Sequence, residues 1–258
     1  MADAEKLVWI KKIVKKGKKY LVYINDEDEG IIFTEDQIVN YRIIKGNSFY
    51  QKDFDRIIDS LDLGKALDKV LKYIDYKPRT EKEAADYLLN LALTNDQIDE
   101  LIQKLKDLHF IDDERYTRMF VEEGIRHQNG PNLIRHQLLN KGIKPELIDQ
   151  FLANYTVQEQ HDNALDMANK TLKTVIGLPY LKQKESIYSR LNRMGYDYSV
   201  INQVLSVISY SEVDNNRLIM EYQKLLTKEL DQNKIVTRLM AKGYTYQDIK
   251  KVMSEFKA

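Results

Sequence analysis

The sequence predicts a mainly α-helical protein: tandem three-helix repeats forming an elongated, curved array, preceded by a small N-terminal β-hairpin module. Three observations predict this fold. Apolar residues alternate within the first 45 residues, they recur at helical spacing from Ser48 onward, and they occupy matching places in four repeated segments. The 258 residues include only 10 Gly and 4 Pro, which disfavours a loop-rich all-β fold.

The composition excludes several classes of protein. Cysteine is absent, so a disulfide framework, thiol catalysis, iron–sulfur clusters and zinc fingers are excluded. No apolar run approaches the ~18 residues that a membrane span needs. Forty basic residues balance forty acidic ones, which argues against a dedicated nucleic-acid binder with a large phosphate footprint. The N-terminal residues do not resemble a secretory signal, and we expect a cytoplasmic protein.

The N-terminal module should cover residues 1–47. Its strands are expected at Leu7–Val14, Tyr20–Ile24 and Ile31–Thr34. Gly17 lies between the first two and can take a positive φ in a tight turn. Thr34 followed by acidic residues has the composition of a helix start, so a short helix should run to about Arg42. A connecting helix is then expected over residues 48–65.

Four segments share one pattern of apolar residues around a tight turn. The turn residue is Gly142, Gly195 or Gly243 in three copies and Ala92 in a fourth. Apolar residues lie eight and four positions before it and six, nine and ten positions after it, so each group occupies one face of a helix. Glycine reaches the left-handed region at little cost, so the three glycines are expected as structural turn residues.

Each of these helix–turn–helix segments is preceded by a further amphipathic segment, which makes the repeat a three-helix unit. The predicted units cover residues 66–112, 113–156, 157–211 and 212–258. The longest unit carries an extra connector around Pro179. A single unit has little core of its own, so stacking on its neighbours should supply more.

Three stretches carry a resemblance to a known family. They are Tyr76–Glu83 (YKPRTEKE), Phe110–Thr117 (FIDDERYT) and the Gly130–Ile143 stretch with Gly-Pro, Ile134, Leu138 and Lys-Gly-Ile in register. Together these motifs resemble the bacterial RecX regulatory proteins, densely over residues 66–155 and weakly through the last two repeats. The N-terminal module is similar to the extension of longer members. Two positions depart from the family pattern, since Ala92 replaces the turn glycine and Asn132 stands where many members carry a basic residue.

The resemblance implies a regulator of the recombinase RecA. Such a protein binds RecA and its single-stranded DNA filament and modulates, mainly inhibits, its recombinase, ATPase and co-protease activity. Its setting would be recombination, DNA repair and the SOS response. The resemblance implies no enzyme activity and no cofactor, and we expect a monomer. The alternatives are a helical-repeat protein that binds nucleic acid independently of RecA, with weak direct DNA binding, and a scaffold for other partners.

Ten basic residues are candidate contacts for RecA or DNA. They are Lys11, Lys12, Lys15, Lys16, Lys18, Lys19, Arg79, Arg115, Arg126 and Arg135. Trp9 and Tyr20 interleave with the lysines, as stacking residues do in single-strand binders. The alternative for the lysines is a solvated hairpin tip that protects edge strands. The alternative for the arginines is exposed helix charge with pairing such as Glu122–Arg126.

The acidic triplet Asp112, Asp113 and Glu114 has two interpretations. Asp112 or Asp113 can cap the helix that begins near Glu114, and this structural interpretation is favoured over a divalent-cation site. The four histidines lack metal-ligand spacing, so no metal site is expected. Phosphate-binding glycine loops and a nucleophile elbow are absent from the sequence, so we expect no catalytic residues.

Overall fold

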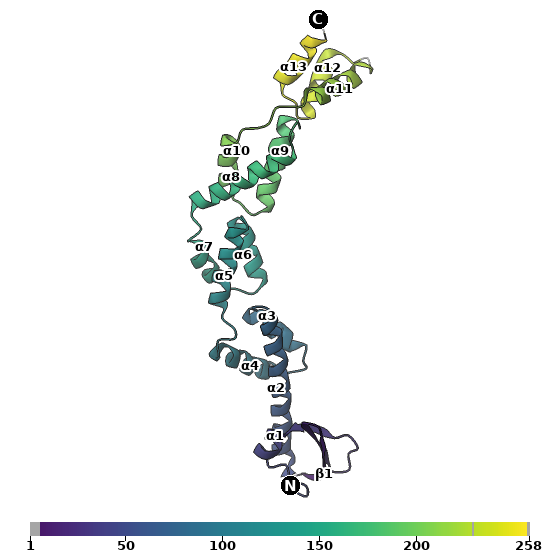
Figure 1. Ribbon diagram of the computed structural model, residues 1–258, viewed down its shortest axis with the longest axis vertical. Helices are drawn as coiled ribbons and strands as arrows, with labels where there is room; N and C mark the ends of the chain where they lie inside the picture. Colours follow the sequence, from purple (N-terminus) through teal and green to yellow (C-terminus); the bar gives the residue numbers. More distant parts are fainter. Residues whose placement is uncertain (1–5, 229, 257–258) are drawn as a thin grey trace, which may run out of the picture. The chain divides into compact units, whose positions relative to one another are not determined.

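The computed structural model describes residues 6–228 and 230–256 of the chain. These residues form one four-stranded antiparallel sheet and thirteen helices (Figure 1). The chain divides into two compact units, Met1–Asp112 and Asp113–Ala258. The sheet and the first three-helix group belong to the first unit, and the remaining three groups belong to the second. None of the described helices is both long and apolar enough to span a bilayer.

The sheet has the strand order β3-β2-β1-β4. Its strands are β1 (Leu7–Lys16), β2 (Lys19–Ile24), β3 (Ile31–Thr34) and β4 (Ser48–Tyr50). Lys11 is the extra residue of a bulge in β1, because Ile10 pairs with Ile24 while Lys12 pairs with Tyr23. The bulge lets the strand turn its buried residues toward one core.

Strand β4 corrects the expected three-stranded module that ended at residue 47. Residues 48–50 pair with Leu7, Val8 and Trp9 of β1. Phe49 falls within the connecting helix expected over residues 48–65, but it lies in β4, and its ring is 6.0 Å from that of Phe54, the first buried residue of the helix that follows. A three-residue strand is too short to show alternation, so tertiary pairing alone reveals it.

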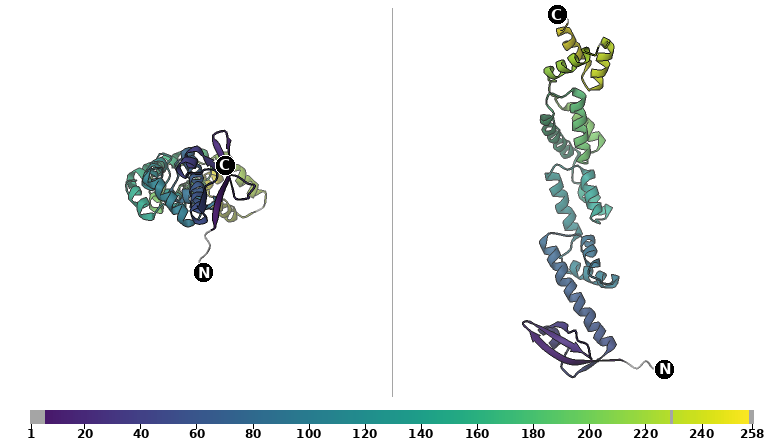
Figure 2. Two further views of the ribbon diagram at one scale, coloured as in Figure 1. Left: turned by 90° about the horizontal axis from the view of Figure 1, so that it is seen from below. Right: turned by 90° about the vertical axis from the view of Figure 1, so that its right-hand side faces the viewer.

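Helix α2 (Gln51–Tyr76) is one continuous 26-residue helix. It replaces two expected elements, the connecting helix over 48–65 and the first repeat helix from Ala66. Its first half covers the sheet through Phe54, Ile57 and Leu61 (Figures 1 and 2). Its second half joins the first three-helix group through Ala66 and Val70. Gly64 lies between the halves inside the helix, where a glycine weakens propensity but does not break the helix.

Capping boxes begin many of the helices. In α1 (Glu35–Asn40) the box is Thr34 with Gln37, in α3 (Glu81–Leu89) it is Thr80 with Glu83, and in α4 (Asn95–Asp107) it is Thr94 with Gln97. Each threonine hydroxyl accepts a bond from a backbone N–H that would otherwise lack a helical partner. The turn chemistry of the sequence therefore sets where these helices start.

The second unit contains three successive three-helix groups. They are α5 (Asp113–Arg126) with α6 (Pro131–Asn140) and α7 (Pro145–Leu152), α8 (Val157–Thr174) with α9 (Tyr180–Arg193) and α10 (Tyr198–Val207), and α11 (Asn215–Leu226) with α12 (Gln232–Ala241) and α13 (Tyr246–Glu255). Each group has its own cluster of buried apolar residues. Together with the first group, they make four copies of the three-helix repeat.

The repeat offsets identify the cores of all four groups. The residues eight before, four before and six after the turn are at most 4% exposed in every copy: Ala84, Leu88, Ile98, Ile134, Leu138, Ile148, Ile187, Leu191, Ile201, Ile235, Leu239 and Ile249. The first two offsets lie on the middle helix and the third on the last helix of each group. The middle and last helices therefore meet through the same three positions in each repeat.

Candidate functional site

The turn residue of every repeat has a left-handed backbone. Gly142, Gly195 and Gly243 have φ values of 82°, 83° and 98°, and Ala92 reaches 55° in the fourth copy. A side chain at such a φ is strained by contact between its Cβ and the following carbonyl oxygen. Glycine relieves this strain, and Ala92 retains it.

In the second unit, two of these glycines also join successive repeats. The Gly195 carbonyl accepts a hydrogen bond of 3.1 Å from the backbone N–H of Asn132, the second residue of α6. The Gly243 carbonyl accepts one of 3.2 Å from Leu181, the second residue of α9. The first turn of a helix has N–H groups without an internal partner. Each of these repeats therefore supplies a backbone acceptor to the middle helix of the repeat before it.

The junction at Gly195 is closed by a second glycine. The Gly130 N–H donates to the carbonyl of Met194 at 2.7 Å. A Cβ on Gly130 would lie 2.4 Å from the Gly195 carbonyl carbon, and one on Gly195 would lie 2.2 Å from the Leu133 nitrogen. The two backbones approach more closely than any side chain allows, so the Gly-Pro and Met-Gly motifs are complementary parts of one contact.

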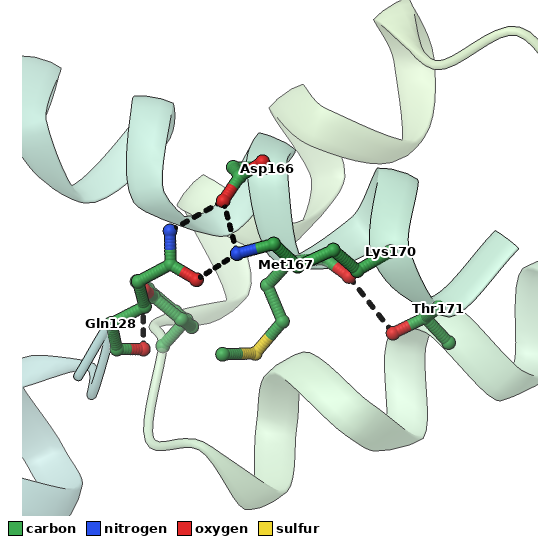
Figure 3. Close-up of polar contacts among 6 residues, drawn as sticks. Gln128, Asp166, Met167, Lys170 and Thr171 are labelled. Carbon is green, nitrogen blue, oxygen red and sulfur yellow. Dashed lines mark hydrogen bonds and ion pairs between the residues drawn. The ribbon is translucent and has the colours of Figure 1, made fainter. Parts of the chain in front are cut away.

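Side chains extend this junction on one side (Figure 3). The buried Tyr196 hydroxyl donates to the backbone carbonyl of Gln128 at 2.8 Å. The Gln128 amide donates to Asp166 at 2.6 Å and accepts from the Lys170 ammonium at 3.1 Å, and Lys170 pairs with Asp166 at 2.6 Å. Gln128 itself has a positive φ of 59°. These contacts fix the turn between α5 and α6 against α8.

Two groups in this network have shifted pKa values. Burial raises the pKa of Tyr196 above its ordinary value, and the neighbouring Tyr155 hydroxyl adds to the shift. Hydrogen bonds from Lys170 and then Gln128 lower the pKa of Asp166. Near neutral pH the tyrosine is therefore a neutral donor and the aspartate a carboxylate, as the observed contacts require.

Sequence reasoning missed Lys170, which belongs to this network, and two further cations next to it. Lys170 of α8 and Arg190 and Arg193 of α9 line a groove of about 550 Å³ between the two helices. Lys170 is about twenty residues from the two arginines and becomes their neighbour only when α8 and α9 pack together. The available signal was the charge of residues 166–196, which include six basic and two acidic side chains.

The six candidate lysines lie on the hairpin of β1 and β2, and all are exposed. Lys11 pairs with Asp26 at 3.2 Å, so the acidic turn after β2 neutralises one of them. Lys12 and Lys15 lie over the rings of Tyr23 and Tyr20 at 5.9 and 5.3 Å. A hydrogen bond with Tyr20 raises the pKa of Lys15. Lys16 and Lys19 face each other beside the Gly17 turn, and Lys18 lies within that turn.

The four candidate arginines have different surroundings. Arg79 stacks at 3.8 Å on Tyr73 and pairs with Glu83 at 3.7 Å, with 12% of its side chain exposed. Arg115 is an exposed residue of α5. Arg126 pairs with Glu123, three residues back, whereas the expected partner was Glu122. Arg135 of α6 pairs with Asp149 of α7. The structure therefore gives Arg79 a packing role and leaves the contact role of all four as a prediction.

The acidic triplet lies at the start of α5. Asp112 directly precedes the helix, and Asp113 and Glu114 occupy its first turn, where negative charge is favourable. Among the described residues, no group of three or more His, Asp or Glu side chains could hold a metal ion.

Comparison with known proteins identifies the family. Residues 112–152 match the family model described as "RecX, second three-helix domain". The "Regulatory protein RecX" of Lactococcus lactis is 32% identical over 97% of this chain and 98% of its own length. This chain belongs to the RecX family. A relative of the same name from Streptococcus agalactiae serotype V is 31% identical over 96% of this chain and 99% of its own length.

Two solved RecX structures resemble the fold. The crystal structure of a regulatory protein RecX matches with a TM-score of 0.61 at 25% identity, covering 77% of this chain and 99% of that chain. The RecX structure from Lactobacillus salivarius matches with a TM-score of 0.53 at 29% identity and covers 58% of this chain and 99% of that chain. The three-helix repeat is therefore a RecX architecture.

Proposed function

We propose that this RecX protein binds RecA and the filament that RecA forms on single-stranded DNA, and that it modulates, mainly inhibits, the ATPase, recombinase and co-protease activities of RecA. The observation that carries the proposal is the near full-length similarity to RecX regulatory proteins. The protein acts by binding, without catalysis of its own.

Several weak contacts acting together would supply the affinity. The backbone bonds at Gly195 and Gly243 link the repeats of the second unit, so their exposed side chains belong to one connected surface. Linked sites bind far more tightly than single ones because the later contacts form within one complex. This supports a mode of inhibition in which no single repeat suffices.

The proposed contact residues are the hairpin lysines and the arginines of the second three-helix group, of which Arg115 and Arg126 are exposed and Arg135 is half-buried. Arg115 and Arg126 lie on α5 and Arg135 on α6. Arg79 is the weakest of the candidates, because a partner would first have to displace it from Tyr73 and Glu83. RecA surfaces with acidic side chains are the partners that these arginines would fit.

The test is DNA-dependent ATP turnover by the RecA of the same organism, with the full chain added in increasing amounts. We expect turnover to fall as the chain binds the filament, with binding followed separately by co-sedimentation. The chain alone should hydrolyse no ATP. An absence of both binding and any change in turnover, even with excess protein, would refute the proposal.

The basic hairpin favours the second candidate, a nucleic-acid binder that acts without RecA. Changing Lys15, Lys16, Lys18 and Lys19 to Gln should then weaken binding to free DNA and flatten its salt dependence. The fold should persist, because all four side chains are exposed. If the variant binds free DNA as well as the natural chain does, the hairpin is a solvated tip.

A further inference from the structure

The groove between α8 and α9 combines positive charge with an open cavity. Its walls come from the second half of α8 and the second half of α9, and His127 and Gln128 also line it. Its volume is about 550 Å³. Lys170, Arg190 and Arg193 line it, and no lining residue in the described part of the chain is acidic. An anion is therefore the complementary ligand.

The two arginines are the cations left available to a ligand. Lys170 is already held by Asp166 and Gln128. Neither Arg190 nor Arg193 forms an ion pair with another described residue. They are three positions apart on one helix, which places them on the same face about 5–6 Å apart at Cβ. Guanidinium groups so placed can each donate two hydrogen bonds to a phosphate.

The hydroxyl groups that line the groove are not available as hydrogen-bond donors to an anion. Thr171, Thr174 and Ser186 donate to the carbonyls of Met167, Thr171 and Lys182 within their own helices, at 2.9, 2.7 and 2.8 Å. The hydroxyl oxygens lie on the groove wall, but each O–H already donates to a backbone carbonyl. Recognition therefore depends on the cationic side chains.

The fold does not require these arginines. At the position of Arg190, five residues before the turn, the other repeats have Tyr87, Gln137 and Arg238. At the position of Arg193, two residues before the turn, they have Asn90, Asn140 and Ala241. A basic residue occupies both positions in the third repeat alone. The other three repeats form the same three-helix fold without this pair of basic residues, so folding does not explain why the pair is present.

We propose that this groove is a phosphate-binding site that takes backbone phosphates of single-stranded DNA. The spacing of Arg190 and Arg193 suits two successive charged groups better than one compact anion. The partly buried Met194 also lines the groove and offers apolar surface to a nucleotide base. The inference goes beyond the proposed RecA regulation, because it requires no RecA.

The test measures direct binding of the full chain to a fluorescent oligo-dT by anisotropy over a range of salt concentrations. The double variant Arg190→Gln, Arg193→Gln should lose about tenfold or more in affinity at low salt. The slope of log affinity against log salt should decrease by about 1.4, since each single-strand phosphate contact contributes about 0.7. Arg190→Lys with Arg193→Lys keeps both charges and should retain most of the slope.

The matched control is Lys182→Gln with Lys184→Gln, which removes the same charge from exposed positions of α9 outside the groove. Its affinity should change less than threefold, and all variants should keep the melting midpoint of the natural chain. Equal losses in the control and the arginine variant would overturn the proposal, as would absence of oligo-dT binding at low salt.

A second arm measures binding of inorganic phosphate and dTMP. If the arginine variant loses these ligands but binds the strand normally, the site holds free phosphates and the strand proposal fails.

Discussion

The two repeat junctions of the second unit use the same backbone contact at different distances. A Cβ on Gly195 would lie 2.2 Å from a backbone nitrogen of α6, whereas one on Gly243 would lie 3.3 Å from the side-chain carbons of Leu181 and Pro179. Both glycines have a positive φ and both carbonyls accept a bond from the second residue of the preceding middle helix. One sequence feature thus satisfies two separate requirements: turn conformation at both junctions, and close approach at the first alone.

The largest effect is expected for Gly195→Ala. The methyl group would meet the backbone of α6, which cannot move aside without breaking the Asn132 bond. Strain at positive φ adds to overpacking, so the free energy of unfolding should fall by about 3–5 kcal/mol. Urea unfolding of the full chain measures it. A loss of only about 1–2 kcal/mol, the size of the conformational strain alone, would show that the junction can open.

Gly243→Ala should cost less. Its methyl group would lie against movable side chains, so the expected loss is the conformational cost of about 1–2 kcal/mol. The same urea experiment compares the two variants directly. If both variants lose the same free energy of unfolding, the closer approach of the backbones at Gly195 contributes nothing to stability.

Tyr196→Phe removes the hydroxyl that bonds to Gln128 at the tighter junction and should cost about 1–2 kcal/mol. It should also change the alkaline stability. Because the folded pKa of Tyr196 is raised above the ordinary 10.0, its contribution is complete below pH 10 and is lost as the pH rises toward the folded pKa. The natural chain should therefore lose stability above pH 10 more steeply than the variant. If the stability of both proteins falls equally with rising pH, other groups cause the alkaline loss. Tyr210 is one such group, because burial raises its pKa to about 12.

The smallest effect, and the only stabilising one, is expected for Ala92→Gly. Ala92 occupies the turn position with a φ of 55°, so glycine removes strain of about 1–2 kcal/mol. Glycine also increases the entropy of the unfolded chain, which offsets about 0.4–1 kcal/mol. A net gain of about 0.5 kcal/mol should raise the melting midpoint slightly. A clear loss of stability would mean that the Ala92 methyl group contributes packing that its turn conformation does not reveal.

The sequence predicted the repeat cores more completely than the candidate site. Residues such as Ile134, Leu138 and Ile148 recur at fixed offsets, and a helix converts such offsets directly into one buried face. Strand β4 escaped prediction because its three residues show no period and depend on pairing with β1. We expected two helices in place of the continuous α2, because the buried residues of its first half face the sheet and those of its second half face other helices.

The candidate site was harder because its residues are not close in the sequence. A dense run such as Lys15–Lys19 is visible in one line, whereas Lys170 and Arg193 meet only through the packing of α8 on α9. The partner of Arg126 was misjudged by one residue, since both the i,i+3 and i,i+4 positions are within reach on a helix. The sequence alone suggests that Arg79 is an exposed charge available to a partner. Its contact with the Tyr73 ring depends on the fold and could not be predicted.

The bond from each middle helix to the next turn glycine gives the second unit a direction. The acceptor for Asn132 comes from Gly195, and that for Leu181 comes from Gly243, so at both junctions the later repeat completes the earlier one. During synthesis, Asn132 and Leu181 would emerge from the ribosome 63 and 62 residues before their backbone acceptors, Gly195 and Gly243. Shortening the chain from its C-terminal end would leave an unmatched N–H on the repeat that becomes last, whereas shortening it repeat by repeat from the start of the unit would remove each donor with its own repeat and leave no such N–H unmatched.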